Sequence, residues 1–165
     1  MRVDGNGSLI TQPLVELVRA GYRLRWDGLH GWAHWMRVRD NGLRLAAETG
    51  ADVAVVEMFA LFHDARRWND DHDPGHGARG AALVDLASAG ALPLESWQRE
   101  LLQDACTRHT MGLTDADVTV QTCWDADRLD LGRAGIRPDP ALLCTEAARR
   151  PEVIRWAWRR SRDGV

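Results

Sequence analysis

The adjacent pair His63-Asp64 is the residue combination in this sequence with the clearest capacity for chemistry. It ends the apolar segment VAVVEMFALFHD, so an imidazole and a carboxylate fall where a buried surface must give way to a polar one. Burying an ionised aspartate is costly unless a cation or hydrogen bonds compensate. A metal ion would satisfy both groups, because neutral imidazole and carboxylate are ordinary ligands of divalent ions. A helix-end pair bonded only to the backbone is the alternative.

Two further residues accompany the pair along the chain. His34 precedes it in the string HWMRV, and Asp127 follows it in ADRLD. This order resembles the HD superfamily of metal-dependent phosphohydrolases, whose pattern is a His, an adjacent His-Asp and a distant Asp. The flanking strings agree as well, since the family's first His is often followed by xxRV and its last Asp stands in an A-D-x-L helix. The resemblance covers about residues 29–135 of a chain that we expect to be one HD-like domain over residues 1–165.

Carried over by position, the resemblance implies a metal-binding set of two histidines and two aspartates: His34, His63, Asp64 and Asp127. Such a set with open water positions suits Mn, Fe, Mg, Co, Ni or Zn. Asp125 and Asp127 would point about 200° apart on a helix, so only one of them can face the metal. The family's register favours Asp127. Asp125 is then expected to be a cap or a hydrogen-bond partner, and Asp130 to line the same side as Asp127.

His76 and His109 would extend this set to a second ion. Superfamily members that bind two metals place two additional histidines between the HD pair and the final Asp, and Asp64 would then bridge the ions. His76, in DPGHG, and His109, in CTRHT, occupy that interval in this order. Each also fits an ordinary helix-terminal histidine, and for His109 a cation near a helix C-terminus is favourable in itself. Whether one or two ions bind therefore stays open. Asp64, His76 and His109 are our candidate catalytic residues, because a carboxylate or imidazole can accept the proton of an attacking water.

The two remaining histidines are weaker candidates. His30 lies one helical turn before His34 and could share its face. A place at a helix start or on the surface is the more ordinary reading of His30. His72 falls in the polar segment RWNDDHDPGH, which we expect to be a loop.

Arginine supplies every permanently charged basic side chain, because the chain contains no lysine. Its planar fork pairs bidentately with phosphate, so Arg37, Arg67 and Arg128 are candidate substrate-binding residues. Most arginines in a chain this rich in aspartate are nevertheless expected to be solvated or paired. Trp68 is the best of eight tryptophans to wall a substrate pocket, while the others are expected to pack in the core. Arg66 and Arg67 stand where hydrolases of the stringent-response nucleotide carry an acidic pair, which disfavours that activity.

Helices must position these residues. Apolar residues recur at helical spacing almost throughout, and no stretch alternates as a strand would. The spacing predicts helices over residues 12–24, 29–49, 53–65, 75–88, 94–110 and 118–131, a short one after residue 139 and a last one from residue 151. Gly50 would end the second of these, and Asp52 would cap the third. The prediction is therefore an all-α, HD-domain-like helical bundle of about seven or eight helices.

Composition limits the classes of function. The chain has 165 residues, of which 45% are hydrophobic, enough for one domain with a sizeable core. A net charge of -3 indicates no nucleic-acid polymer as partner. No apolar run approaches the roughly 20 residues of a membrane span, and the first residues lack the order of a signal peptide, so we expect a cytoplasmic protein without a membrane partner. Three widely spaced cysteines fit neither a disulfide framework nor a CxxC zinc site.

The resemblance implies a metal-dependent phosphohydrolase acting on a small phosphoester or nucleotide. The metal would lower the pKa of a bound water and polarise a phosphoryl oxygen. Two alternatives stay open at this point. One is a di-iron HD-type oxygenase that uses O2, similar to inositol oxygenase and the phosphonate-cleaving oxygenases, and the other is a non-catalytic metabolite-binding HD protein. The pattern carries no signal for an oligomeric state.

Overall fold

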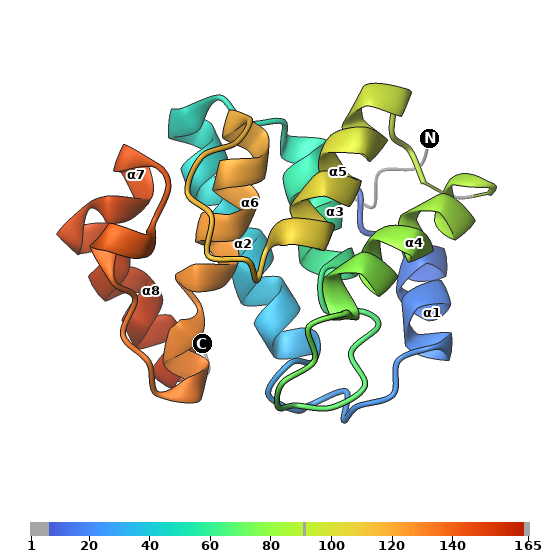
Figure 1. Ribbon diagram of the computed structural model, residues 1–165, viewed down its shortest axis with the longest axis horizontal. Coiled ribbons are helices and arrows are strands. Elements are labelled where there is room, and N and C mark those ends of the chain that lie inside the picture. The colour runs from blue at the N-terminus through green and yellow to red at the C-terminus, as the bar shows by residue number, and fades with distance from the viewer. Residues whose placement is uncertain (1–6, 91, 164–165) are drawn as a thin grey trace.

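The computed structural model describes residues 7–90 and 92–163, and every regular element within them is a helix (Figure 1). The α-helices are α1 Gln12–Ala20, α2 Trp32–Thr49, α3 Val53–Phe62, α4 His76–Ser88, α5 Ser96–Arg108, α6 Val118–Arg128, α7 Glu146–Arg149 and α8 Pro151–Asp163. Two 3-10 helices, η1 Leu131–Ala134 and η2 Pro140–Leu142, connect α6 to α7. The prediction of an all-α bundle is confirmed. Over these residues, no helix has both the length and the apolar character that a membrane crossing requires.

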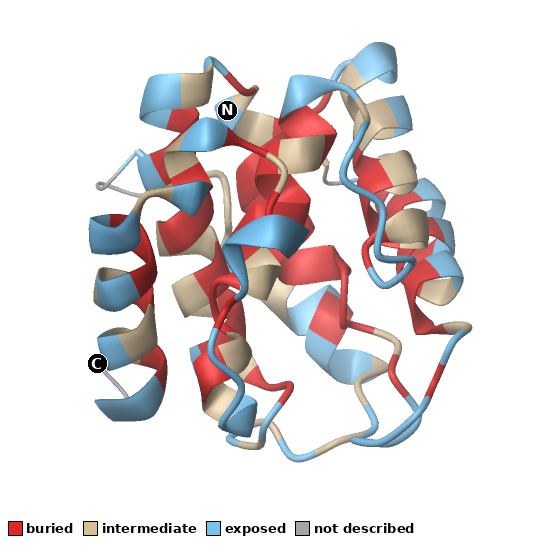
Figure 2. Ribbon diagram, turned by 60° about the vertical axis from the view of Figure 1, so that its left-hand side comes forward, coloured by how far each residue is buried: buried red, intermediate tan, exposed pale blue. Residues whose placement is uncertain are grey.

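Helix α3 lies at the centre of the bundle. Eight of its ten residues are buried, and it packs against α1, α2, α4, α5 and α6. A helix that is apolar on all sides is the kind that other elements surround, and Figure 2 shows the buried residues gathered on the inward faces of the helices. Asp52 caps its first turn as predicted, since its carboxylate accepts a hydrogen bond from the Val55 amide at 2.9 Å. His63 and Asp64 therefore follow directly on the most enclosed helix of the molecule.

A second apolar cluster holds the C-terminal helices against α2 and α6. It contains Leu45, Leu129, Leu143, Ala148, Val153, Ile154 and Ala157. Helix α8 also packs against the 3-10 helix η1, which follows α6 directly. The amphipathic last helix thus buries its apolar face on its own chain.

Several helix boundaries were predicted wrongly. The first helix ends at Ala20, not near residue 24, and the second begins at Trp32, not at residue 29. Residues 21–31 between these helices form a loop, in which the Tyr22 hydroxyl donates a hydrogen bond to the His30 carbonyl at 2.7 Å. The spacing of apolar residues does not reveal such a bond. The third helix ends at Phe62 and the sixth at Arg128, each three residues early. Helix α7 was not predicted.

Candidate metal centre

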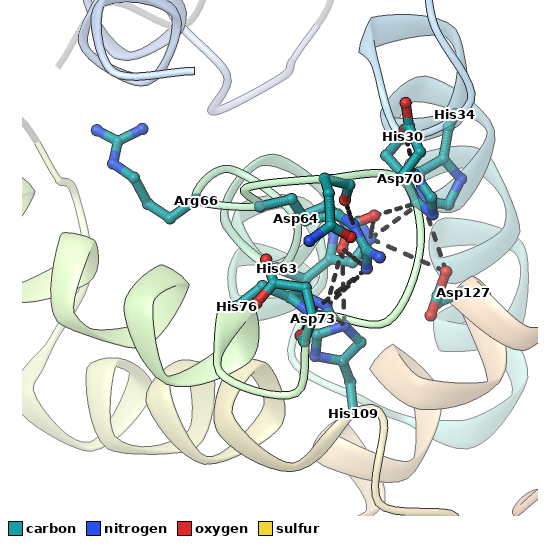
Figure 3. A network of polar contacts seen from close by, with 12 residues as sticks. His30, His34, His63, Asp64, Arg66, Asp70, Asp73, His76, His109 and Asp127 are labelled. Atoms are coloured by element: carbon teal, nitrogen blue, oxygen red, sulfur yellow. Dashed lines mark hydrogen bonds and ion pairs between the residues drawn. The ribbon is translucent and has the colours of Figure 1, made fainter. Parts of the chain in front are cut away.

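Six imidazole and carboxylate side chains from five segments converge beside the end of α3 (Figure 3). They are His34 on α2, His63 and Asp64 after α3, His76 at the start of α4, His109 after α5 and Asp127 on α6. All are buried except Asp127, whose side chain keeps 16% of its exposure. The described part of the chain thus brings together every residue of the predicted metal set and both additional histidines.

Close helix packing brings the second pair of histidines to this place. A Cβ atom on Gly77 would lie 2.3 Å from the Cys106 carbonyl oxygen, and one on Gly80 would lie 2.5 Å from the Phe62 carbonyl oxygen. Only residues without a side chain allow α4 to approach the ends of α5 and α3 so closely. His76, the first residue of α4, consequently reaches His109 and the segment that follows α3.

The first group of three consists of His34, His63 and Asp127. The Nε2 atoms of the two histidines lie 3.1 Å apart. Asp127 Oδ1 lies 3.5 Å from Nε2 of His34 and 3.9 Å from Nε2 of His63. Two ring nitrogens and one carboxylate oxygen therefore point at a common position.

The second group consists of Asp64, His76 and His109. The two Nε2 atoms lie 2.9 Å apart, and Asp64 Oδ1 lies 3.1 Å from that of His76 and 3.8 Å from that of His109. The other oxygen of Asp64, Oδ2, faces the first group, at 3.5 Å from His34 Nε2 and 3.6 Å from His63 Nε2. Asp64 thus offers one oxygen to each pair of histidines.

Each of the four rings directs its Nδ1 atom to an oxygen acceptor. The acceptors are Asp130 Oδ2 for His34 (2.7 Å), the Phe59 carbonyl for His63 (3.0 Å), the Asp73 carbonyl for His76 (2.5 Å) and the Cys106 carbonyl for His109 (2.7 Å). A neutral imidazole that donates from Nδ1 carries a bare lone pair on Nε2. Each pair of Nε2 atoms therefore brings two lone pairs face to face, which is favourable when a cation lies between them. Such outer acceptors also fix the orientation of metal-binding histidines.

The carboxylates of the centre are held in their ionised form. Burial favours the neutral acid of Asp64, but the facing histidines, His63 first among them, keep its pKa well below the usual value. Burial acts in the same way on Asp127, where Arg133 and the histidines hold the pKa low. Asp127 Oδ1 is buried and accepts no hydrogen bond from the described residues. This oxygen is ionised, accepts no hydrogen bond from those residues, faces two ring nitrogens and lies 3.6 Å from Arg133 Nη2, so it is suited to bind a further cation.

The histidines differ in their affinity for protons. Burial lowers the pKa of His63 to about 3, although Asp64 and Asp127 oppose the shift. His109 is equally enclosed, but the nearby carboxylates of Asp64 and Asp127 outweigh burial and raise its pKa. His63 is consequently neutral at physiological pH, the form in which imidazole binds a metal.

The donor set fits a divalent metal ion. It comprises four imidazole nitrogens and the oxygens of two aspartates, and no cysteine belongs to either group. Nitrogen and oxygen donors of this kind suit Mn, Fe, Co, Ni, Zn or Mg, and two groups of three allow one or two ions.

The candidate substrate-binding arginines lie in different surroundings. Arg67 Nη1 lies 3.1 Å from His76 Nε2 and 3.4 Å from Asp64 Oδ1, so its charge is part of the second group's environment. Arg37 donates from Nε and Nη2 to Asp130, at 2.7 and 3.2 Å. Its fork is thus occupied by the carboxylate that orients His34.

Arg128 and Trp68 lie outside the cluster of six, although Arg128 lines a hollow that His109 also lines. Arg128 donates to the Leu113 carbonyl at 2.7 Å and to the Leu142 carbonyl at 2.8 Å, so it ties the loop before α6 to the end of η2. Trp68 is 57% exposed and stacks under the Arg79 guanidinium at 3.8 Å, outside the cluster of six. Substrate binding by these side chains stays a prediction.

Asp125 and His30 have structural partners of their own. Asp125 Oδ1 accepts from the Cys144 amide at 2.7 Å and Oδ2 from the Thr145 amide at 2.8 Å, so it anchors the segment before α7. His30 precedes α2 and does not share a helix face with His34, contrary to one of the two sequence-based readings. Its Nδ1 lies 2.8 Å from Asp70 Oδ1. Asp127 and not Asp125 lies with the histidines of the centre.

Two hollows open beside the second group, and Thr110 lines both. One, of about 240 Å³, is lined mainly by polar residues, namely Arg67, Asp71, the exposed His72, Asp73 and His76. The other, of about 230 Å³, is mainly apolar and extends from His109 to the loop after η1. A ligand beside His76 and His109 would therefore meet a polar wall on one side and an apolar wall on the other.

Comparison with solved structures identifies an HD-domain-like fold. The chain is similar to the crystal structure of a predicted HD superfamily hydrolase from an uncultured Thermotogales bacterium, with a TM-score of 0.67 and 21% sequence identity. The match covers 89% of this chain and 84% of that one. No family model and no curated protein matches the sequence. The similarity establishes the fold, whereas the site rests on the geometry described above.

Proposed function

We propose that this protein, with its HD-domain-like fold, is a metal-dependent phosphohydrolase acting on a small phosphoester or nucleotide. The observation that carries the proposal is the position of Asp64, whose two oxygens each face one pair of histidines. A carboxylate between two sets of nitrogen donors suits a pair of divalent ions, and such pairs serve phosphoryl transfer to water. The name of the structural neighbour, a predicted HD superfamily hydrolase, agrees with this reaction class.

The six convergent side chains would hold the metal. His34, His63 and Asp127 would bind one ion, His76 and His109 the other, and Asp64 both. When bound, a divalent ion activates a water molecule as nucleophile and neutralises charge on a phosphoryl group. The low pKa of Asp64 suits a permanent ligand and makes this carboxylate a weak proton acceptor.

Side chains around the centre would orient the substrate. Arg67 already contacts Asp64 and His76, and it also lines the polar hollow, so its guanidinium is placed to attract a phosphoryl oxygen next to the second group. The apolar hollow beside His109 offers room for an uncharged part of the ester. Asp130 accepts from His34 and is itself held by Arg37, which keeps the ring aimed at the centre.

A metal-supplementation assay tests the proposal. The purified chain, loaded separately with Mn, Co, Ni, Zn, Fe or Mg, is assayed for phosphate release from a panel of phosphomonoesters and nucleotides. We expect turnover with at least one metal, and a loss of more than ~100-fold in Asp64→Asn, because removing a ligand costs at least as much as removing an outer partner. Asp115→Asn, at an exposed loop position, is the matched control. Absence of phosphate release with every metal, or equal activity of the two variants, would overturn the proposal.

A di-iron oxygenase is the second candidate, because four histidines and two aspartates around one bridging carboxylate also suit two irons. Iron content after aerobic and anaerobic reconstitution, together with the reactants consumed, distinguishes the oxygenase from the hydrolase. Oxygen uptake that depends on iron and on an organic substrate, without phosphate release, would favour the oxygenase. Turnover with Mn, Co or Ni in the absence of oxygen would favour the hydrolase.

A further inference from the structure

A cavity of about 640 Å³ lies between the end of α1, the turn after Asp64 and helix α4. None of the six residues of the metal centre lines it. Figure 3 shows the Arg66 side chain extending away from the cluster of histidines, toward α1. Small-molecule sites typically enclose ~300–1,000 Å³, so the cavity has the size of a ligand site and is separate from the centre described above.

Four arginines line this cavity, and no lining residue is acidic. Arg67 and Arg79 have carboxylate partners, in Asp64 and Asp73. The other two arginines, Arg23 and Arg66, form no ion pair with any carboxylate of residues 7–90 and 92–163. In a chain with a net charge of -3, this is a local concentration of uncompensated positive charge.

Arg66 is held in place without being neutralised. Its Nη1 donates to the Val18 carbonyl at 3.0 Å and to the Ala65 carbonyl at 2.9 Å. Burial, followed by the charge of Arg23, lowers the pKa of Arg66. Two guanidinium groups that line one cavity without a carboxylate partner form a site that an anion would stabilise.

The cavity also has an apolar part beside these cations, and the Arg23 guanidinium lies 5.7 Å from the centre of the Trp68 ring. Trp68 lines this part, and its backbone amide donates to Asp73 Oδ2 at 2.8 Å. Arg79 covers the indole and donates from Nε to the Arg66 carbonyl at 2.9 Å. Leu83 and Leu86 of α4 complete the apolar part. Contacts that these side chains already make before binding reduce the entropy lost by ordering them around a ligand.

We propose that this cavity is a second ligand site, which binds an organic phosphate with a flat ring, such as a nucleoside monophosphate. The phosphate group would lie between Arg23 and Arg66, which offer unpaired donors, and the ring would pack against Trp68 and Leu83. This site does not depend on the proposed hydrolase activity, because its lining and the metal ligands are different residues. Arg67, which lines the cavity and contacts Asp64, is the direct connection between the two sites.

Isothermal titration of the purified full-length chain with adenosine monophosphate tests the assignment, with adenosine and inorganic phosphate as comparison ligands. We expect binding of the monophosphate that weakens with added salt, weaker binding of phosphate and none of adenosine. Arg23→Gln and Arg66→Gln should each raise the Kd about 10-fold or more. Arg25→Gln, at an exposed arginine of the same loop that pairs with Asp27, should leave the Kd unchanged. Arg23 is exposed, has no hydrogen-bond partner among the described residues and has its guanidinium over Trp68 of the same cavity, so its replacement changes the site and not the packing of the helices.

The same titration with Asp127→Asn separates this site from the metal centre. We expect that variant to bind the monophosphate with unchanged affinity. Loss of binding in Asp127→Asn would place the nucleotide at the metal centre and overturn the second site. Equal weakening of binding by Arg25→Gln and Arg23→Gln would also overturn it. So would the absence of binding at millimolar concentrations of the monophosphate. Phosphate binding as tight as that of the monophosphate would overturn the part of the assignment that concerns the ring.

Discussion

The Nε2 atoms of His76 and His109 lie 2.9 Å apart, while the Nδ1 atom of each ring faces a backbone carbonyl oxygen. The Nε2 atoms of His34 and His63 repeat this relationship at 3.1 Å. The structure therefore orients two pairs of nitrogen lone pairs toward each other, with Asp64 between them. This arrangement is costly without a cation and favourable with one, and the predictions below follow from it.

Metal should bind in two equivalents and stabilise the fold. We expect two ions per chain after reconstitution and a concentration-dependent rise in Tm, because an ion that binds only the folded state stabilises it. His109→Gln should reduce the content to one ion, since the first group does not include that residue. Inductively coupled plasma mass spectrometry after gel filtration measures the number of metal ions per chain. His72→Gln, at an exposed loop position, is the control. One ion per wild-type chain would contradict the two-ion arrangement.

Asp130 should tune metal affinity without touching the metal. Its Oδ2 accepts a hydrogen bond from His34 Nδ1 at 2.7 Å. Asp130→Asn would weaken this hydrogen bond, which orients the His34 ring. Loss of such an outer partner typically lowers metal affinity ~10–100-fold. A competition titration with a chromophoric chelator measures the change, and Asp115→Asn provides the reference. Unchanged affinity in Asp130→Asn would show that packing alone orients His34.

The metal-free protein should lose stability as the pH falls. Burial lowers the pKa of His63 to about 3, whereas an unfolded histidine titrates near ~6.5. Between these values the unfolded chain binds a proton that the folded chain does not, so stability declines from about pH 6.5 downward. His109 opposes part of this decline, because its pKa is raised and its stabilisation is fully present below pH ~6.5.

Urea midpoints at pH 7.0, 5.5 and 4.5, measured without metal, check the sign of this dependence. His63→Gln should flatten the decline, and His72→Gln should follow the wild type. A wild-type midpoint that rises toward acidic pH would show that His109 outweighs His63.

Gly80 should resist substitution because α4 contacts the end of α3 there. A Cβ atom would lie 2.5 Å from the Phe62 carbonyl oxygen, a backbone atom that moves only with its helix. We expect Gly80→Ala to lower the free energy of unfolding by ~1–3 kcal/mol, the usual cost of overpacking. Gly90→Ala, where the added carbon meets nothing within 4 Å, should be close to neutral. Equal urea midpoints for the two variants would refute the proposed contact.

Local sequence features carried much of the fold prediction. Apolar spacing identified the six longer helices before residue 131, and Asp52 caps α3 as its position predicted. These features depend on residues within one or two turns of each other, so the sequence displays them directly. The order of His34, the His63-Asp64 pair and Asp127 likewise predicted a set of side chains that the fold does bring together.

Tertiary packing decided how those side chains are used. The His34–Asp130 bond joins residues 96 positions apart, and the split of the Asp64 oxygens between two histidine pairs depends on where α4 lies. The same packing occupies Arg37 with Asp130 and turns Arg66 away from the centre. Such relationships depend on distances and angles between helices, which are set by the packing of many side chains at once and not by any local pattern. The sequence therefore determined which groups could do chemistry, and the tertiary structure determined which of them face one another.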